Sequence, residues 1–226
     1  MRRHATVRTL ATILASIPVL TLLTAPAEAA PDPAAGARPA DDTAYSASLA
    51  SNAVDFQPGS GLCGLNSTQS VGWQFNVGTE VTVVAMTWFD DGQNGLEISH
   101  EVGIWDPSGT LISNTHVTIP AGNAATLDGI WRVVPITPVQ LPVGNGYIVG
   151  GYNGVHGECL SFNVTQVVNP AISYVDATFS GLNAIFERPS TFSGADNGFY
   201  GAGFQLELGA VSVDSESWGS VKAFYR

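Results

Sequence analysis

The chain has 226 residues, a net charge of −11 at neutral pH and only 12% charged residues. Because such a charge repels phosphate backbones and anionic lipid headgroups, nucleic acids and membrane surfaces are excluded as expected partners. Ordinary globular domains carry about 25% charged residues. Here glycine, serine, threonine and asparagine take their place, which favours an extracellular β protein rich in turns.

The N-terminal residues have the three parts of a secretory signal. Three arginines in the first eight residues form a basic region, an uncharged apolar stretch covers residues 10–23, and Ala-Glu-Ala at 27–29 matches a small-residue cleavage site. An apolar run of about 14 residues is too short to cross a bilayer as a helix. We therefore expect a signal peptide over residues 1–29 and a secreted, extracellular protein that is not inserted in the membrane after cleavage.

The rest of the chain divides by composition into three parts. Residues 30–50 are rich in Ala, Pro and Asp with little to bury, and are expected to form a disordered linker. Residues 210–226 form a C-terminal tail that is rich in serine and acidic residues. Between them, residues 51–209 contain short runs of β-branched and aromatic residues separated by turn formers, which predicts one β domain.

The pattern in this domain predicts about nine strands. They cover residues 71–77, 81–89, 98–105, 110–119, 130–136, 147–152, 160–168, 171–179 and 199–208. Short turns between consecutive strands favour antiparallel pairing, and this number of strands buries one core when two sheets pack together. The expected fold class is all-β, an antiparallel two-sheet β-sandwich of jelly-roll type.

The only two cysteines, Cys63 and Cys159, are expected to form a disulfide because an exported protein folds in an oxidising compartment. No C-x-x-C spacing points to a metal or a redox motif.

The most informative stretch of the sequence covers residues 88–106. It contains Phe-Asp-x-Gly-x-x-Gly-Leu at 89–96 and His-x-Val-Gly-Ile-Trp at 100–105, followed by Ser-Gly-x-Leu at 108–111. In these motifs the chain resembles family 4082 of the domains of unknown function, and the resemblance extends over roughly residues 70–207. It implies an extracellular bacterial β-sandwich module with no assigned reaction.

The same stretch has part of the spacing of a calcium loop. If Asp90 is the first position, Asn94 is the fifth, the turn glycine Gly95 the sixth and Glu101 the twelfth. Gly92 at the third position offers no side-chain ligand. The alternative is a strand-connecting turn whose Asp and Asn side chains bind their own backbone. Calcium is the one cofactor that the sequence suggests.

His100 lies on the strand face of Val102 and Ile104, and is therefore expected to be a core histidine with a satisfied hydrogen bond. A zinc protease of the His-Glu-x-x-His type is excluded because Ile104 stands at the second histidine position.

The tryptophans are the remaining side chains that suggest ligand binding. Trp73, Trp88 and Trp131 are expected to fill the space between the sheets. Trp105 alternates away from Val102 and Ile104 and is the best candidate for an exposed ring that stacks on a sugar.

The sequence contains no nucleophile elbow, phosphate loop or dinucleotide motif. We therefore expect no enzyme, but a noncatalytic, secreted binding or surface-associated module. Its expected partner is an extracellular polysaccharide or a cell-surface component, with carbohydrate as the ligand class. A glycoside-type hydrolase with an unrecognised carboxylate site and a structural matrix protein are the alternatives.

Overall fold

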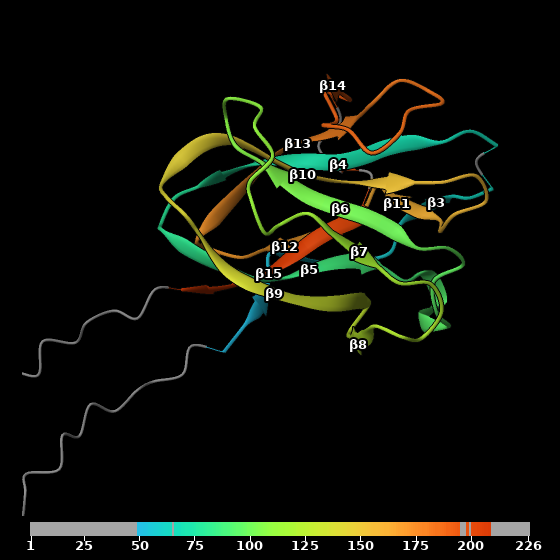
Figure 1. The fold of residues 1–226 in the computed structure, drawn as a ribbon, viewed down its shortest axis with the longest axis horizontal. Helices are drawn as coiled ribbons and strands as arrows, with labels where there is room; N and C mark the ends of the chain where they lie inside the picture. The colour runs from blue at the N-terminus through green and yellow to red at the C-terminus, as the bar shows by residue number, and fades with distance from the viewer. Residues whose placement is uncertain (1–48, 65, 195–197, 199, 209–226) are drawn as a thin grey trace, which may run out of the picture. The chain divides into compact units, whose positions relative to one another are not determined.

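The computed structural model describes residues 49–64, 66–194, 198 and 200–208, which form an all-β sandwich of antiparallel sheets (Figure 1). The predicted signal peptide, most of the predicted linker, the C-terminal tail and Trp218 lie outside the described residues. Within the described ranges, no helix has the length and apolar character needed to cross a membrane.

One sheet has five strands in the order β1-β15-β5-β9-β8. These strands are β1 (Ser51–Asn52), β15 (Ala202–Leu208), β5 (Val81–Phe89), β9 (Trp131–Leu141) and β8 (Thr126–Asp128). All of its strand pairs are antiparallel.

The other sheet has six strands in the order β14-β13-β4-β10-β6-β7. These strands are β14 (Thr191–Phe192), β13 (Ile172–Phe179), β4 (Gln69–Val77), β10 (Gly144–Asn153), β6 (His100–Trp105) and β7 (Val117–Ile119). Two small ladders join β3 (Ser60–Leu62) to β11 (Leu160–Phe162) and β2 (Val54–Gln57) to β12 (Thr165–Val168).

The long strands lie where the pattern predicts them, and β5 has the predicted bounds. The described residues form fifteen strands rather than about nine, because several short strands have no clear pattern of their own. Two predicted strands differ most from the observed ones. The strand expected over residues 110–119 is reduced to β7, because Asn114 has a positive φ of 66° and the Thr115 hydroxyl donates to the Ile112 carbonyl oxygen. The strand expected over residues 160–168 divides at Asn163, where φ is 54°.

Aromatic side chains from both sheets fill the core. Trp73, Trp88 and Trp131 are buried, which confirms their predicted place. The Trp73 ring of β4 stacks on Phe204 of β15 with ring centroids 5.8 Å apart. The two sheets are thus joined through stacked rings.

Three glycines lie in register across neighbouring strands of the six-stranded sheet. Gly150 of β10 is paired with Gly72 of β4 on one side and with Gly103 of β6 on the other. A Cβ atom on Gly150 would lie 2.6 Å from the Pro189 ring, and one on Gly103 would lie 3.2 Å from the Phe186 ring. Gly150 and Gly103 therefore make room for the segment 180–190, which we call the cover loop.

The cover loop is tied to β4 by hydrogen bonds. The Ser70 hydroxyl donates to the Ile185 carbonyl oxygen and accepts the Glu187 N–H. Phe186 packs against Trp105 with ring centroids 5.2 Å apart. The expectation that Trp105 is exposed is therefore wrong, since its exposed fraction is 5%. The alternation of β6 does direct Trp105 away from the core, but the cover loop closes over that face.

Gly151 follows Gly150 in β10, and a substitution at this position tests how tightly the core is packed. A Cβ atom at this position would lie 2.5 Å from Trp88 Cζ3 and 2.8 Å from the Glu101 carbonyl oxygen. We expect Gly151→Ala to lower the free energy of unfolding by about 1–3 kcal/mol through overpacking, measured by denaturant titration.

Gly181→Ala is the matched control, because nothing lies within 4 Å of a Cβ atom at this position. Equal stability of the two variants would contradict the packing described for Trp88.

Candidate functional site

A pocket of about 280 Å³ lies beside the disulfide. Its lining residues are mostly acidic, polar or glycine: Cys63, Gly64, Asp91, Asn94, Glu97, His156, Gly157, Glu158 and Cys159. Neither lysine nor arginine is among them. The pocket is therefore a source of hydrogen-bond acceptors and of negative charge.

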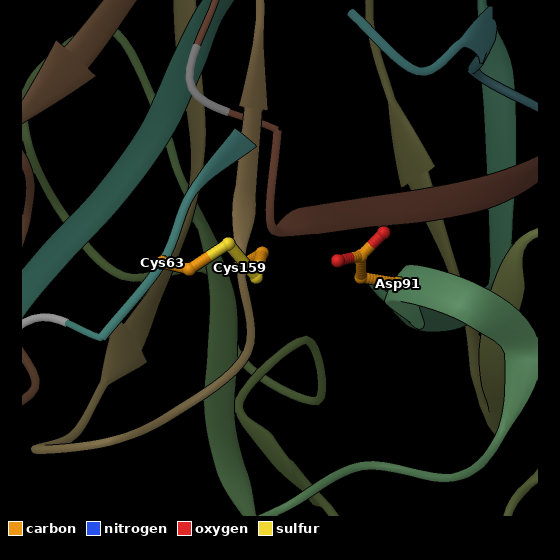
Figure 2. A group of neighbouring side chains, drawn as sticks. All are labelled: Cys63, Asp91 and Cys159. Carbon is orange, nitrogen blue, oxygen red and sulfur yellow. A yellow bond between two sulfur atoms is a disulfide. The ribbon is translucent and has the colours of Figure 1, made fainter. Parts of the chain in front are cut away.

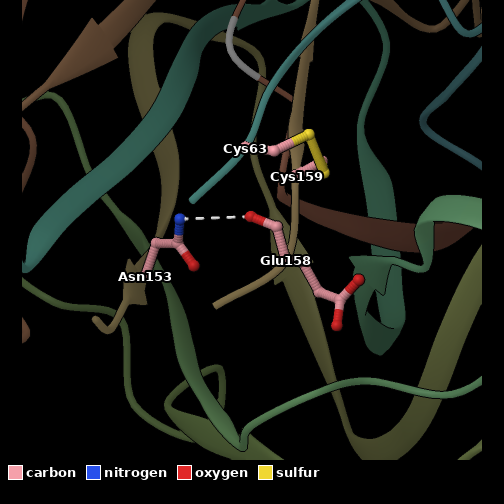
Figure 3. The surroundings of a disulfide bond; sticks show 4 residues. All are labelled: Cys63, Asn153, Glu158 and Cys159. Carbon is pink, nitrogen blue, oxygen red and sulfur yellow. Dashed lines mark hydrogen bonds between the residues drawn. A yellow bond between two sulfur atoms is a disulfide. The ribbon is translucent and has the colours of Figure 1, made fainter. Parts of the chain in front are cut away.

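The disulfide between Cys63 and Cys159 is present, which confirms the predicted pairing (Figure 3). Cys63 follows β3 and Cys159 precedes β11, and the last ladder pair before them is Leu62 with Leu160. The Asn153 amide donates to the Glu158 carbonyl oxygen at 3.4 Å. Figure 3 shows the Glu158 carboxylate pointing away from this bond.

The opposite side of the pocket is formed by residues 91–97, which we call the rim segment. It begins with a 3-10 turn, η1 (Asp91–Gln93). Gly95 has a positive φ of 104°, and a Cβ atom there would lie 2.9 Å from Asn123 Oδ1, so only glycine fits. Leu96 exchanges two backbone hydrogen bonds with Gly122. The rim segment is thus held against the loop before β8.

A buried ion pair lies under the rim segment. Arg132 Nε donates to Asp90 Oδ2 at 2.7 Å, and the two side chains have exposed fractions of 5% and 0%. The guanidinium also donates to Asn123 Oδ1 and to the Ala125 carbonyl oxygen. Asp90 in turn accepts the Gly95 N–H at 3.1 Å. The hydrogen bonds made by both partners offset the cost of removing the pair from water.

Glu158 is the buried acid of the pocket, with an exposed fraction of 5%. Its Oε1 atom accepts the Glu97 N–H, so that it holds the end of the rim segment. Burial raises the pKa of Glu158 above the ordinary value. The hydrogen bond from Glu97 opposes the rise, and the charges of Asp90, Glu97 and Asp91 add to it.

The three residues of the predicted calcium loop have different surroundings. Asp90 is buried in its ion pair with Arg132, and its bond to the Gly95 N–H is of the kind expected for the alternative, a strand-connecting turn. Asn94 is exposed and lines the pocket. Glu101 Oε2 lies within hydrogen-bond distance of His116 Nε2, at 3.0 Å. Calcium binding by this set stays a prediction.

Among the described residues, one group of at least three His, Cys, Asp or Glu side chains is close enough to hold a metal ion. It consists of Cys63, Asp91 and Cys159, whose ligand atoms lie within 4.8 Å of one another (Figure 2). Because both sulfurs are joined in the disulfide, neither is a thiolate that would bind a metal.

His100 lies in the core, as predicted from the strand alternation. Its ring stacks on Trp88 with centroids 3.9 Å apart, and Nδ1 lies 3.0 Å from the Tyr152 carbonyl oxygen. Nε2 is buried and has no hydrogen-bond partner among the described residues, so the predicted hydrogen bond is found for one ring nitrogen only. Burial lowers the pKa of His100 from 6.5 to about 4, while the bond to Tyr152 partly opposes this shift.

Because the pKa of His100 is lowered in the folded protein, we expect the folded protein to lose stability in acid. Between pH 6.5 and 4 the unfolded chain binds a proton at His100 that the folded protein does not, so stability falls as the pH falls. The contribution is about 3 kcal/mol once the pH is below both pKa values. We expect His100→Gln, which keeps a neutral donor, to lose less stability than the wild type between pH 7 and 4.5 in urea titrations. The same pH dependence in both proteins would show that His100 is not buried in its neutral form.

Sequence reasoning missed Arg132 and Glu158. Arg132 is a charged residue between two apolar strand residues, Trp131 and Val133, which is a detectable signal for a buried ion pair. Glu158 had no such signal, because it lies in an irregular loop between β10 and β11.

Comparisons with protein-family models, curated proteins and solved structures found no match for the chain. The resemblance to family 4082 of the domains of unknown function therefore stays a prediction.

Proposed function

We propose that the protein is a secreted, noncatalytic binding module, and that its ligand site is the pocket between the disulfide and the rim segment. The observation that carries this proposal is the pocket itself, in which carboxylates and an amide meet and the described lining residues include no lysine or arginine. Ligand sites are typically concave, with a few convergent polar groups.

The lining selects the chemistry of the ligand. Asp91 and Glu97 are exposed carboxylates at the pocket, and no arginine or lysine in the part of the lining that the structure describes neutralises them. Anionic ligands are therefore repelled, whereas hydroxyl groups donate hydrogen bonds to carboxylate and amide oxygens. A neutral carbohydrate, with several hydroxyls on one face, fits this set of acceptors. The partner that we propose is thus an extracellular polysaccharide or a glycan of a cell surface.

The rim segment supports binding because its position is fixed before a ligand arrives. The Asp90 and Glu158 carboxylates each accept a backbone N–H from it, at Gly95 and Glu97. A preformed site avoids the ordering cost of a mobile loop. Stacking on Trp105 is not part of this site, since the cover loop packs on that ring.

A glycan array with the mature protein, followed by calorimetry on the best ligand, tests the proposal. We expect Asp91→Asn and Glu97→Gln each to weaken binding about tenfold, because a hydrogen bond to a charged group contributes about 1.5–3 kcal/mol. Glu80→Gln is the control, since Glu80 is an exposed acid outside the pocket lining. The proposal fails if no neutral glycan binds, or if all three variants bind like the wild type.

One observation favours a second candidate function, a glycoside-type hydrolase. Glu158 is buried with a raised pKa beside the exposed carboxylates of Asp91 and Glu97, and glycosidases pair a proton-donating acid of raised pKa with a second carboxylate. Release of reducing sugar from a polysaccharide panel, abolished by Glu158→Gln, would replace the binding proposal with this one. Without such release, the binding module is retained.

A further inference from the structure

We propose that Cys63, Cys159 and Asp91 bind a zinc ion once the disulfide is reduced. This site goes beyond the proposed binding of carbohydrate, because it uses the sulfur atoms and exists only in the reduced protein.

The two cysteines stay together without their bond because the backbone holds them. They follow directly on a ladder in which Leu62 pairs with Leu160 and Gly61 with Ser161, so they face each other across two antiparallel strands. Their Cα atoms are 4.2 Å apart. The hydrogen bonds of this ladder do not depend on the disulfide, and reduction therefore leaves two neighbouring thiols.

Asp91 supplies the third ligand from a different part of the chain. It lies in η1, and Figure 2 shows one carboxylate oxygen directed toward the disulfide. The carboxylate oxygen and both sulfurs lie within 4.8 Å of one another. Ligands of a tetrahedral zinc ion, at about 2.0–2.3 Å from the metal, are about 3.3–3.8 Å apart. Small side-chain rotations therefore bring all three atoms to zinc, and water takes the fourth position.

The chemistry of the donor set favours zinc over calcium or magnesium. Thiolates are soft ligands that select zinc, whereas hard cations prefer oxygen atoms alone. The negative charge of the pocket, from Glu97 and Glu158 beside the site, further favours a divalent cation.

The reaction that opens the site is a thiol–disulfide exchange. A dithiol reductant transfers two electrons to the disulfide, which leaves Cys63 and Cys159 as thiols and the reductant as its own disulfide. Zinc then binds both sulfurs and displaces their two protons to solvent. Cys63 is exposed and Cys159 is half-buried at the pocket, so reductant and metal reach the sulfurs from solvent.

The test uses the mature protein, reduced with a dithiol and desalted without oxygen. Cobalt serves as the spectroscopic probe, and zinc affinity is measured against a chromophoric chelator. We expect one cobalt per chain, with thiolate charge-transfer and tetrahedral bands, in the reduced protein and none in the oxidised protein. Asp91→Asn should weaken zinc binding at least about tenfold, and Cys159→Ser should remove the charge-transfer pattern of two thiolates.

Glu80→Gln is again the control and should bind zinc like the wild type. The proposal is overturned if the oxidised protein binds equally well, if the reduced protein does not bind, or if Asp91→Asn binds as tightly as the control. If reduction unfolds the chain, the thiols bind metal without any contribution from Asp91. Asp91→Asn then binds zinc as tightly as the control, which also overturns the proposal.

Discussion

The buried ion pair of Asp90 and Arg132 is the interaction on which the pocket end of the sandwich depends. The pair joins the end of β5 to β9, and its remaining hydrogen bonds reach the rim segment and the loop before β8. Removing one partner of such a pair leaves an uncompensated charge and costs about 3–5 kcal/mol. A buried charge pair therefore holds the rim segment of the pocket, while Asp91 and Glu97 at the pocket stay exposed.

The two faces of the six-stranded sheet pack against different parts of the protein. Its inner face packs Trp73 and His100 against the other sheet. Its outer face carries the cover loop, which lies against Gly150 and Gly103, so that Trp105 packs against Phe186. Polar chemistry is thereby concentrated at the pocket, between the disulfide and the rim segment. This separation explains how a protein with several buried tryptophans can have a pocket lined mostly by acidic and polar residues.

The sequence predicted the long strands, the buried tryptophans and the disulfide because each follows from local pattern or compartment. The sequence did not predict contacts that a residue makes with a segment far away in the chain. Trp105 has the strand alternation of an exposed residue, and only the cover loop, about 80 residues later, buries it. Arg132 lies 42 residues after Asp90 in the chain, and no local spacing indicates that its guanidinium pairs with the Asp90 carboxylate. Glu158 reaches the pocket from an irregular loop, and no hydrophobic periodicity in the sequence predicts the path of such a loop.

Hydrogen exchange at two amides measures most directly whether buried carboxylates hold the rim segment. The Gly95 N–H donates to Asp90 and the Glu97 N–H donates to Glu158. If both bonds persist in solution, both amides exchange at least about a hundredfold more slowly than in an unstructured peptide. In Arg132→Gln, Gly95 should lose this protection before the strands do. Exchange of both amides at the rate of a free peptide in the wild type would contradict a preformed pocket.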